Sequence, residues 1–538
     1  MTRDIGALSA KTFDVLVVGG GIYGLTIGCD AAQRGMTVAL IERDDFGSGS
    51  SFNHLRTIHG GLRYLQTLDL ARSRESIRER RTLARIAPHT IRPLLFALPL
   101  SRSMMQGRMA MRAGFLLDRL VAFDRNRDVP ASHRLPAGRV VSKSEAIERF
   151  PNLRRRGLTG AATWYDYVTV EADRLTLSWA LAAAGYGAVL ANYVEAEAPI
   201  VDRGRVIGVK AIDRRTGGDL EISARVTVNA TGAAVDRLLK PVGLSTRLPL
   251  LKAMNLVTTR SAGEEALGGQ SPSGRSVFLV PWRGRALFGT WESSSPAAST
   301  DTTVKEDEVT RFITDVNQAF PALELTWADV SLVHRGVVPA VAGPDGSVAL
   351  EGHEQIRDHA AEGVEGLVTV AGTKYTTARA AAERVTDTVA AKLGTAQAPC
   401  RTAVTPLPGA IDDVALAIAD ARRDFDATLL SDSIPHLLTA YGSRFREVIE
   451  IAPAHPAWGS RLSDASPIVG AEIAWAARNE MAVTLCDGVL RRTPLGALGH
   501  PGDAAAERAA SIMAAELRWS EERKRQELEA LRAFYSPF

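Results

Sequence analysis

Residues 13–24 read Phe-Asp-Val-Leu-Val-Val-Gly-Gly-Gly-Ile-Tyr-Gly. The first six form an apolar, valine-rich run of strand length, which is typical of a strand buried on both faces. We expect a helix to follow as far as about Arg34, with Gly35 at its C-terminal end. A second strand should cover residues 36–41 and end at Glu42. The segment therefore predicts a complete βαβ unit.

The glycines of Gly19-x-Gly21-x-x-Gly24 have separate physical tasks. The first allows a tight turn, the second lets the backbone approach a pyrophosphate, and the third permits close packing of helix on strand. The helix N-terminus supplies free N–H groups and a partial positive charge for phosphates. Glu42 stands where an acidic residue binds ribose hydroxyls. Because strand, loop, helix and acid are all in register, the motif predicts dinucleotide binding rather than a turn without a ligand.

This loop alone does not distinguish FAD from NAD, but two later segments favour FAD. Asn229-Ala-Thr-Gly232 ends a strand, where flavoproteins often bring a strand end back against the dinucleotide. Gly372-Thr-Lys374 is another strand-to-helix turn, and a helix N-terminus there would stabilise negative charge on a reduced flavin. Each of the two, taken singly, is also an ordinary α/β turn.

Length and composition exclude several classes of protein. The chain has 538 residues, of which 46% are hydrophobic and 23% charged, as in a folded protein of about two to four domains. A net charge of +3 argues against a dedicated nucleic-acid binder. Cys29, Cys400 and Cys486 lie far apart, which argues against a zinc ribbon or a disulfide scaffold and suits a reducing cytoplasm. No metal site is expected.

Three segments of the sequence bear on membrane contact. The first twelve residues have no apolar core, so no secretory signal is expected. The apolar stretch 175–194 contains Gly185 and Gly187, and we interpret it as a buried helix, a turn and a strand rather than a membrane span. Residues 71–120 are rich in arginine, with methionine and leucine beside the charges. Two interpretations of this segment stay open: a peripheral contact with an anionic membrane, and a charged face that is exposed to solvent.

Three segments with nucleotide-domain character are separated by other structure. Besides the N-terminal unit, residues 225–232 and 366–374 have the same strand-and-glycine pattern. We therefore predict one FAD-binding domain made from residues 12–84, 150–240 and 345–400, with a substrate domain made from 85–149 and 241–344. Prolines near 395–412 interrupt the hydrophobic periodicity and indicate a domain boundary. Residues 410–538 are predicted to form a helical domain.

At this point the residues resemble a known family, the FAD-dependent glycerol-3-phosphate dehydrogenases. The resemblance covers nearly the whole chain, and its most specific part is Ile58-His-Gly-Gly-Leu-Arg-Tyr-Leu65. The other matching segments are Asp14 to Gly24, Gly372-Thr-Lys-Tyr-Thr-Thr377, Tyr441-Gly-Ser-Arg444, Asn479-Glu-Met-Ala482, Asp487 and Arg491-Arg-Thr493. The resemblance implies an α/β fold with a glutathione-reductase-like FAD-binding domain. It also implies an inserted antiparallel β substrate domain akin to amino-acid oxidases and an all-α C-terminal domain.

The resemblance also implies a reaction and partners. The secondary alcohol of glycerol 3-phosphate, or of a related polyol phosphate, would be oxidised by hydride transfer to flavin N5, giving dihydroxyacetone phosphate from glycerol 3-phosphate. A quinone or oxygen would be the electron acceptor. We expect a cytoplasmic protein without nucleic-acid partners, and a peripheral contact at the inner face of the cell membrane and a homodimer both stay open.

Alcohol oxidation needs a base for the hydroxyl proton and cations for the developing anion. His59, Arg63 and Lys374 supply these as catalytic candidates, although His59 is equally interpretable as a flavin-packing histidine and Arg63 as a helix-pairing arginine. The expected substrate contacts are Arg63, Tyr64, Asn255, Trp291, Arg335, Val338 and Thr377. The expected cofactor contacts are Gly19, Gly21, Gly24, Glu42, Ser50, Ser51, Ile58, His59, Gly232, Gly372, Lys374 and Thr376.

The sequence departs from the family where substrate is expected. The family's Gly-Val-Arg-Pro is Gly336-Val-Val-Pro339 here, so Val338 replaces a phosphate-binding arginine. The family's Lys-Gly-Ser-His is Lys252-Ala-Met-Asn255, its Gly-Thr-Thr-Asp is Gly289-Thr-Trp-Glu292, and Phe52-Asn-His-Leu55 interrupts its serine-rich run. Since the FAD motifs are intact, this pattern indicates an altered substrate.

Two compensations for the missing arginine are open. Arg335 could turn into the vacated space, or a pocket lined by Val338, Trp291 and Met254 could accept a bulkier or less charged molecule. We favour the second, because three positions along a strand turn a side chain to the opposite face. Two other hypotheses remain: a paralogue acting on a different hydroxy or amine substrate, as an amino-acid oxidase does, and a non-catalytic FAD-binding protein.

Overall fold

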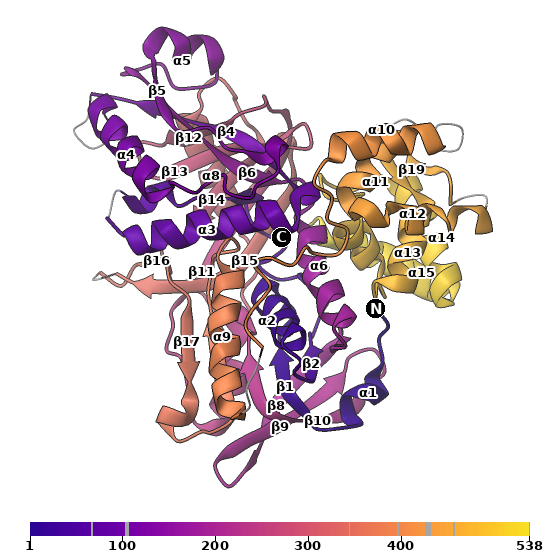
Figure 1. Cartoon of the computed structure of the whole chain (residues 1–538). Coiled ribbons are helices and arrows are strands. Elements are labelled where there is room, and N and C mark those ends of the chain that lie inside the picture. The colour runs from indigo at the N-terminus through magenta and orange to yellow at the C-terminus, as the bar shows by residue number, and fades with distance from the viewer. Residues whose placement is uncertain are drawn as a thin grey trace.

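The computed structural model describes residues 1–65, 68–102, 107–343, 345–394, 398–425, 432–455 and 458–536, except the side chain of Arg63. Figure 1 shows a nucleotide-type sheet with its helices, a second sheet beside it, and a helical domain that contains the C-terminal part of the chain. This is the α/β architecture, with an inserted sheet domain and an all-α C-terminal domain, that the sequence predicts.

The nucleotide-type sheet is built around β1, which covers Phe13–Val18 as predicted. Its strand order is β17-β18-β10-β1-β2-β7, and all neighbours are parallel except β17 at the edge. The other strands are β2 (Val38–Ile41), β7 (Val189–Ala191), β10 (Gly218–Asn229), β17 (Gln355–Asp358) and β18 (Leu367–Ala371). Three distant parts of the chain therefore form one sheet.

Both faces of this sheet are covered, which explains the continuous apolar pattern of β1. Val15 and Val17 point into a core with α2 (Ile22–Gln33), α6 (Ala172–Gly185) and α9 (Ala378–Leu393). Leu16 and Val18 point into a core on the other face. That second face is covered by α1 (Ile5–Ser9), α7 (Val235–Leu239) and the hairpin of β8 (Val194–Asp202) and β9 (Arg205–Asp213). Residues 175–194 thus form part of α6, a turn and β7, as interpreted from the sequence.

The second sheet has the order β16-β15-β11-β14-β13-β12-β4-β6-β3, with β5 paired to β6. Its pairs are antiparallel except β12 with β4, which are parallel. The strands are β3 (Thr57–Ile58), β4 (Ile91–Leu100), β5 (Arg139–Ser142), β6 (Gly160–Thr169), β11 (Leu250–Ser261), β12 (Ala266–Gln270), β13 (Ser276–Trp282), β14 (Arg285–Glu292), β15 (Val330–Ala342) and β16 (Val348–Leu350). Helix α8 (Glu306–Ala319) packs on one face, and α3 (Leu70–Ile86), α4 (Arg108–Val121) and α5 (Lys143–Arg149) lie around the β4–β6 end (Figure 1).

The domain division differs from the sequence prediction at β3, β6 and β16, which we placed in the FAD-binding domain but which belong to the second sheet. We predicted that residues 150–240 belong to the FAD-binding domain, but β6 pairs with β4 along ten residues, from Ile91↔Thr169 to Leu100↔Gly160. Residues 160–169 therefore belong to the second sheet. The alternation of a strand shows which face is buried but not which distant strand pairs with it, so the sequence left this boundary open to error.

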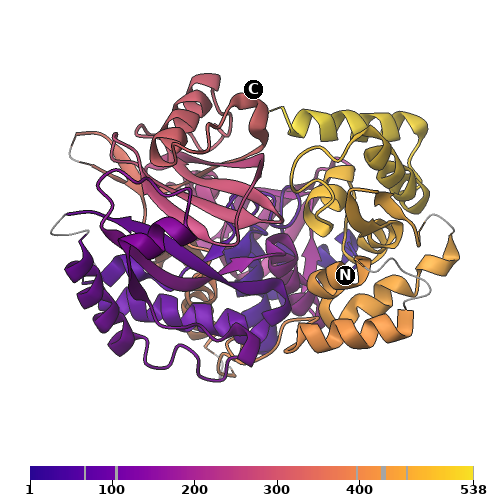
Figure 2. The ribbon, with the colours of Figure 1, turned by 90° about the horizontal axis from the view of Figure 1, so that it is seen from above.

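The helical domain lies beside both sheet domains when the molecule is seen from above (Figure 2). Its helices are α10 (Val414–Phe425), α11 (Ser433–Tyr441), α12 (Phe445–Ile449), α13 (Gly470–Asn479), α14 (Asp503–Leu517) and α15 (Glu521–Phe534), with a small hairpin of β19 (Arg461–Ser463) and β20 (Ser466–Val469). Helices α14 and α15 are separated at Arg518, which adopts a left-handed φ of 54°.

A buried ion-pair network joins the helical domain to the nucleotide-type sheet. Asp45, just after β2, accepts hydrogen bonds from Arg491 at 2.6 Å and from Arg492 at 2.7 Å on both carboxylate oxygens. Asn192 donates to the same carboxylate at 3.0 Å. Burial by itself raises the pKa of Asp45, but the two arginines outweigh burial, so the pKa is lowered overall. The loop that begins at Glu42 is thus held from the far end of the sequence.

We predict that Asp45→Asn lowers the free energy of unfolding by about 3–5 kcal/mol, since it leaves the buried Arg492 guanidinium without a carboxylate partner, although Arg491 keeps its pair with Asp487. The adjacent Asp44 is the control, because its pairs with Arg43 and Arg214 are exposed and Asp44→Asn should cost less than about 1 kcal/mol. Urea unfolding at pH 7 measures both. Since the pKa of Asp45 is lowered by folding, the difference between wild type and Asp45→Asn should shrink as the pH falls below about 4. Equal effects of the two variants would contradict the prediction.

Candidate functional site

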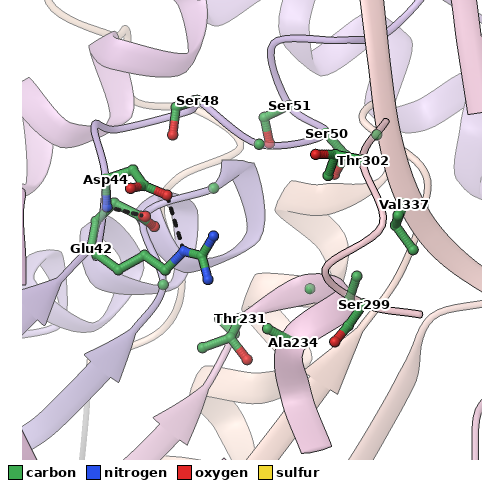
Figure 3. Close-up of a pocket in the computed structure, with 18 of the residues that line it drawn as sticks. Glu42, Asp44, Ser48, Ser50, Ser51, Thr231, Ala234, Ser299, Thr302 and Val337 are labelled. Atoms are coloured by element: carbon green, nitrogen blue, oxygen red, sulfur yellow. Dashed lines mark hydrogen bonds and ion pairs between the residues drawn. The ribbon is translucent and has the colours of Figure 1, made fainter. Parts of the chain in front are cut away.

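A cavity of about 440 Å³ lies where the carboxyl ends of β1, β2 and β10 meet β15 of the second sheet. In Figure 3, Glu42 and Asp44 lie at one end of this cavity, and Ser50, Thr302 and Val337 lie at the other. Its lining comes from the β1–α2 turn, residues 41–44, 48–51, 53, 194–196, 230–234, 237–238, 299, 302, 333 and 335–337, and Phe534. We call residues 48–53 the cradle loop, and this cavity the dinucleotide cavity.

Each of the three motif glycines is required for a different structural reason. Gly19 has a φ of 110°, and a Cβ there would lie 2.5 Å from the carbonyl oxygen of Ala230. A Cβ on Gly24 would lie 1.8 Å from the carbonyl oxygen of Gly19, so this position sets the approach of α2 to β1. Gly21 has an ordinary φ of −76°, and its Cβ would meet only the Ser51 hydroxyl at 3.3 Å. Gly21 therefore leaves the cavity floor open to a ligand, as a diphosphate requires.

The N-terminus of α2 opens into this cavity. The Ser51 hydroxyl accepts the N–H of Ile22 at 2.9 Å, which joins the cradle loop to the first turn of the helix. Glu42 accepts N–H groups from Gly20 at 2.7 Å and from Asp44 at 2.8 Å. Burial raises the pKa of Glu42 while these two hydrogen bonds oppose the shift. Backbone N–H groups, an acid and an open floor are the features that bind the diphosphate and ribose of a dinucleotide, so the residues present fit FAD.

A smaller cavity of about 180 Å³ continues from the first, and we call it the reacting end. The two cavities share seven lining residues: Gly21, Ser50, Ser51, Asn53, Ala230, Gly232 and Gly336. The other residues that line the reacting end are Ile22, Tyr23, His54, Leu55, Ala253, Asn255, Thr290, Val338, Leu350, Gly372, Thr373 and Tyr375. Among the contacts that we predicted from the sequence, Asn255, Val338 and Gly372 line the reacting end. Gly19, Glu42 and Arg335 line the dinucleotide cavity.

Asn53 ties the cradle loop to the second sheet. Its backbone carbonyl accepts a hydrogen bond from the Asn255 amide at 2.8 Å, and its side-chain oxygen accepts the backbone N–H of Arg335 at 3.1 Å. The hydroxyl of Thr290 donates to the Asn255 oxygen at 3.1 Å. Strands β11, β14 and β15 are thereby held in register against the loop that contacts both cavities.

The Ile58–Leu65 segment and the Gly372–Thr377 turn lie against each other beside the reacting end. The ammonium of Lys374 lies 3.8 Å from the centre of the Tyr64 ring, and Arg72 lies 4.4 Å from it. The hydroxyl of Tyr23, which lines the reacting end, donates to the backbone carbonyl of Lys374 at 3.2 Å. The side chain of Arg63, the third catalytic candidate, lies outside the described residues.

His59 lies outside the cavity lining but has a structured environment. Its Nδ1 is 3.4 Å from a carboxylate oxygen of Asp166, and its Nε2 is 2.7 Å from the Thr57 hydroxyl. Asp166 is itself buried, accepts the backbone N–H of Gly60 at 2.7 Å and the indole N–H of Trp164 at 3.1 Å, and pairs with Arg80. Burial raises the pKa of Asp166, but Arg80 and His59 lower it overall. A carboxylate held in this way fixes the orientation of the His59 ring through Nδ1.

Several predicted contacts lie elsewhere. Trp291 and Met254 belong to the core under α8, on the sheet face away from the reacting end, because their neighbours Thr290 and Asn255 point into the cavity and strand side chains alternate. Our expectation that both line the pocket with Val338 is therefore wrong. Ile58 is fully buried in the core, and Gly24, Tyr64, Lys374, Thr376 and Thr377 do not line either cavity.

Val338 and Arg335 lie on different parts of the site. Val338 lines the reacting end, whereas Arg335 lines the dinucleotide cavity together with Val333 and Val337. This is the alternation that the strand argument anticipated, and it places the guanidinium of Arg335 away from the position that the family's arginine would occupy.

Sequence reasoning missed Asn53, Thr290, Tyr375 and Asp166 as parts of the site or its support. Asn53, Thr290 and Tyr375 stood next to residues that we selected, within segments already known to depart from or match the family. No signal in the sequence identified Asp166, because it is a single acidic residue within a strand. Its role becomes clear only from the pairing of β6 with β3, which places it beside His59.

Comparison with known proteins follows the same division of the chain. Residues 14–388 match the family described as FAD dependent oxidoreductase, and residues 400–524 match the C-terminal domain of alpha-glycerophosphate oxidase. The mitochondrial glycerol-3-phosphate dehydrogenase of Mesocricetus auratus is 33% identical, over 98% of this chain and 73% of that protein.

Two solved structures are similar in fold. A glycerol-3-phosphate dehydrogenase from Bacillus halodurans, complexed with FAD, has a TM-score of 0.76 and 26% identity, over 99% of this chain and 96% of that one. Glycine oxidase from Geobacillus kaustophilus has a TM-score of 0.52 and 22% identity, over 74% of this chain and 99% of that one. The second likeness concerns the fold alone.

We predict that Gly21→Ala weakens FAD binding about tenfold or more without unfolding the protein, because its methyl group fits the protein but occupies the open cavity floor. Dilution of the holoenzyme, with release followed by flavin fluorescence, measures the affinity, and circular dichroism measures the fold. Gly24→Ala is the matched comparison and should lose structure as well as flavin, since its Cβ would overlap the backbone of Gly19. Undiminished FAD affinity in Gly21→Ala would remove this glycine from the site.

Proposed function

Because this chain belongs to the family of FAD-dependent oxidoreductases that includes the glycerol-3-phosphate dehydrogenases, we propose that it oxidises the secondary alcohol of glycerol 3-phosphate or of a related polyol phosphate. It is an FAD-dependent oxidoreductase, and bound FAD supplies a hydride acceptor. The observation that carries the proposal is the 33% identity over 98% of the chain, which includes the helical C-terminal domain.

In this proposal the dinucleotide cavity holds the cofactor. The N–H groups at the start of α2 bind the diphosphate, with Gly21 leaving room for it, and Glu42 binds ribose hydroxyls. Ser50, Ser51 and Gly232 line both cavities and so contact the middle of the cofactor. The flavin ring would then lie toward the reacting end, near Gly372, Thr373 and Tyr375.

The reacting end would hold the substrate alcohol. Asn255 and Thr290 offer an amide and a hydroxyl for its oxygen atoms. Lys374 supplies positive charge from an adjacent loop, and Tyr64 orients its ammonium through the ring face. His59 is the proposed proton acceptor, since the buried Asp166 carboxylate, 3.4 Å from its Nδ1, holds the imidazole ring in place.

Val338 bears on which substrate is preferred. Beside it, Leu55, Ala253 and Leu350 make this part of the reacting end apolar, and none of the described residues that line it is an arginine or a lysine. A phosphate is normally held by more than one cation, and an arginine grips it best. We therefore expect glycerol 3-phosphate to bind weakly compared with a longer or less highly charged relative.

The test is anaerobic bleaching of the bound flavin by glycerol 3-phosphate, longer polyol phosphates, glycerol and glycine. We predict that polyol phosphates bleach it, and that Val338→Arg lowers the KM for glycerol 3-phosphate about ten- to hundredfold, the value of one charge-assisted hydrogen bond. Leu350→Arg is the control, because it adds a positive charge to the same cavity at a different position from the family's arginine.

Bleaching by glycine and not by any polyol phosphate would contradict the proposal and indicate an amine oxidase. Absence of bleaching by every compound would favour the non-catalytic alternative. Unchanged KM in Val338→Arg, with efficient wild-type turnover, would show that the missing arginine was never needed.

We infer that α4 provides a peripheral membrane contact through which a quinone accepts the electrons. No helix in the described part of the chain is long and apolar enough to cross a membrane. Met111 and Phe115 point inward from α4, while Met109, Leu116 and Leu120 on its outer side, and Phe123 just after its end, are 63–77% exposed. Such an apolar stripe is unusual on a water-facing helix.

The charges around this stripe suit an anionic surface. Arg112 and Arg119 are exposed on the same helix, and neither has a carboxylate within 4 Å among the residues that the structure describes. Several other arginines of residues 71–120 are neutralised, since Arg74 and Arg81 pair with Asp124 and Arg80 pairs with Asp166. Met104 and Met105, which we counted with the apolar side chains, lie outside the described residues. Figure 1 shows α4 at the edge of the molecule away from the helical C-terminal domain.

We predict that the wild-type protein floats with liposomes that contain anionic lipid, and that Leu116→Glu with Leu120→Glu abolishes this, because carboxylates replace apolar contacts and are repelled. Leu416→Glu is the control, since Leu416 is 59% exposed on α10. Wild-type protein that stays in solution at both low and physiological salt would contradict the inference, and so would equal effects of the α4 and α10 variants.

A further inference from the structure

Arg335 stands apart from the other cations that line the dinucleotide cavity. Arg43 pairs with Asp44 at 3.0 Å, and Arg237 pairs with Glu195 at 2.8 Å. Arg335 has no carboxylate within 4.0 Å among the residues that the structure describes, although its side chain is half-buried. Burial lowers its pKa, and no neighbouring charge opposes that effect. A half-buried guanidinium without a counter-ion is costly unless a bound anion completes it.

The backbone at this position is fixed against the cradle loop. The N–H of Arg335 donates to the side-chain oxygen of Asn53 at 3.1 Å, and Arg335 is paired with Met254 across β11 and β15. A Cβ on the next residue, Gly336, would lie 3.8 Å from the Cα of Ser50. Arg335 therefore belongs to an anchored strand and lines the same cavity as Gly19, Gly21 and Ser51.

The anion that belongs in this cavity is the diphosphate of FAD. The start of α2 contributes only backbone N–H groups and a partial charge, which do not neutralise two full negative charges. Arg335 is the cation on the opposite structural element, and it lines the cavity of the dinucleotide rather than the reacting end where Val338 lies. We propose that Arg335 is the counter-ion of the FAD diphosphate, so that a strand of the substrate domain takes part in holding the cofactor.

The proposal concerns cofactor binding and does not depend on which alcohol is oxidised. Its test uses the holoenzyme, with FAD release on dilution followed by flavin fluorescence, and with displacement of bound FAD by ADP or by riboflavin. ADP contains the diphosphate without the flavin, and riboflavin contains the flavin without phosphate. Arg335→Gln should weaken FAD and ADP about tenfold or more and leave riboflavin unchanged.

Two further variants make the result specific. Arg237→Gln removes a cation that lines the same cavity but is already paired with Glu195, and it should change ADP affinity less than threefold, or about 0.6 kcal/mol. Arg335→Lys keeps the positive charge but loses the planar guanidinium, which can donate two hydrogen bonds to one phosphate. Its affinity for ADP should therefore lie between those of wild type and Arg335→Gln. It also keeps the test decisive if Arg335→Gln does not fold.

Three results would overturn the proposal. The first is unchanged ADP affinity in Arg335→Gln or, should that variant not fold, in Arg335→Lys. The second is an equal loss for riboflavin and ADP, which would indicate a general distortion of the site. The third is a raised KM for a phosphorylated substrate with unchanged FAD and ADP affinity, which would place the guanidinium at the substrate. A failure of the alcohol-oxidation proposal would leave all these binding results as they are.

Discussion

The contact of Gly24 with Gly19 is the constraint on which the site depends. A Cβ at Gly24 would lie 1.8 Å from the Gly19 carbonyl oxygen, so only a glycine lets α2 come this close to the end of β1. That approach brings the N-terminus of α2 to the carboxyl edge of the sheet, where β2 delivers Glu42 and β10 delivers Gly232. A diphosphate needs this convergence, because one turn of helix offers only a few free N–H groups and they must all point at one place.

The site is completed by parts of the chain that are distant from this turn. Asn53 joins the cradle loop to β11 and β15 through two hydrogen bonds, and Asp45 joins the loop after Glu42 to Arg491 and Arg492 of the helical domain. The C-terminal domain is thus connected to cofactor binding without lining most of the cavity. A buried carboxylate between two arginines is costly to break, which makes this connection rigid.

Charge is distributed unevenly along the two cavities. Arg43, Arg237 and Arg335 line the dinucleotide cavity, whereas the described lining of the reacting end is apolar or neutral near Val338. Positive charge for a substrate would have to come from the adjoining loops, where Lys374 lies against Tyr64. The departures from the family at Val338 and Asn255 therefore fall together in one small volume, while the cofactor end keeps the full motif.

The sequence by itself determined the βαβ unit, the FAD motif and the helical C-terminal domain, because these depend on local periodicity and on glycines with steric tasks. It also showed that Arg335 and Val338 face apart, since strand side chains alternate. It did not show that Trp291 lies in the core or that β6 pairs with β4, because alternation defines two faces without saying which one meets the cavity. Only the tertiary structure decided that Asn53 joins two domains and that Arg335 reaches the dinucleotide cavity, since both follow from pairings between strands and loops about 200 to 300 residues apart.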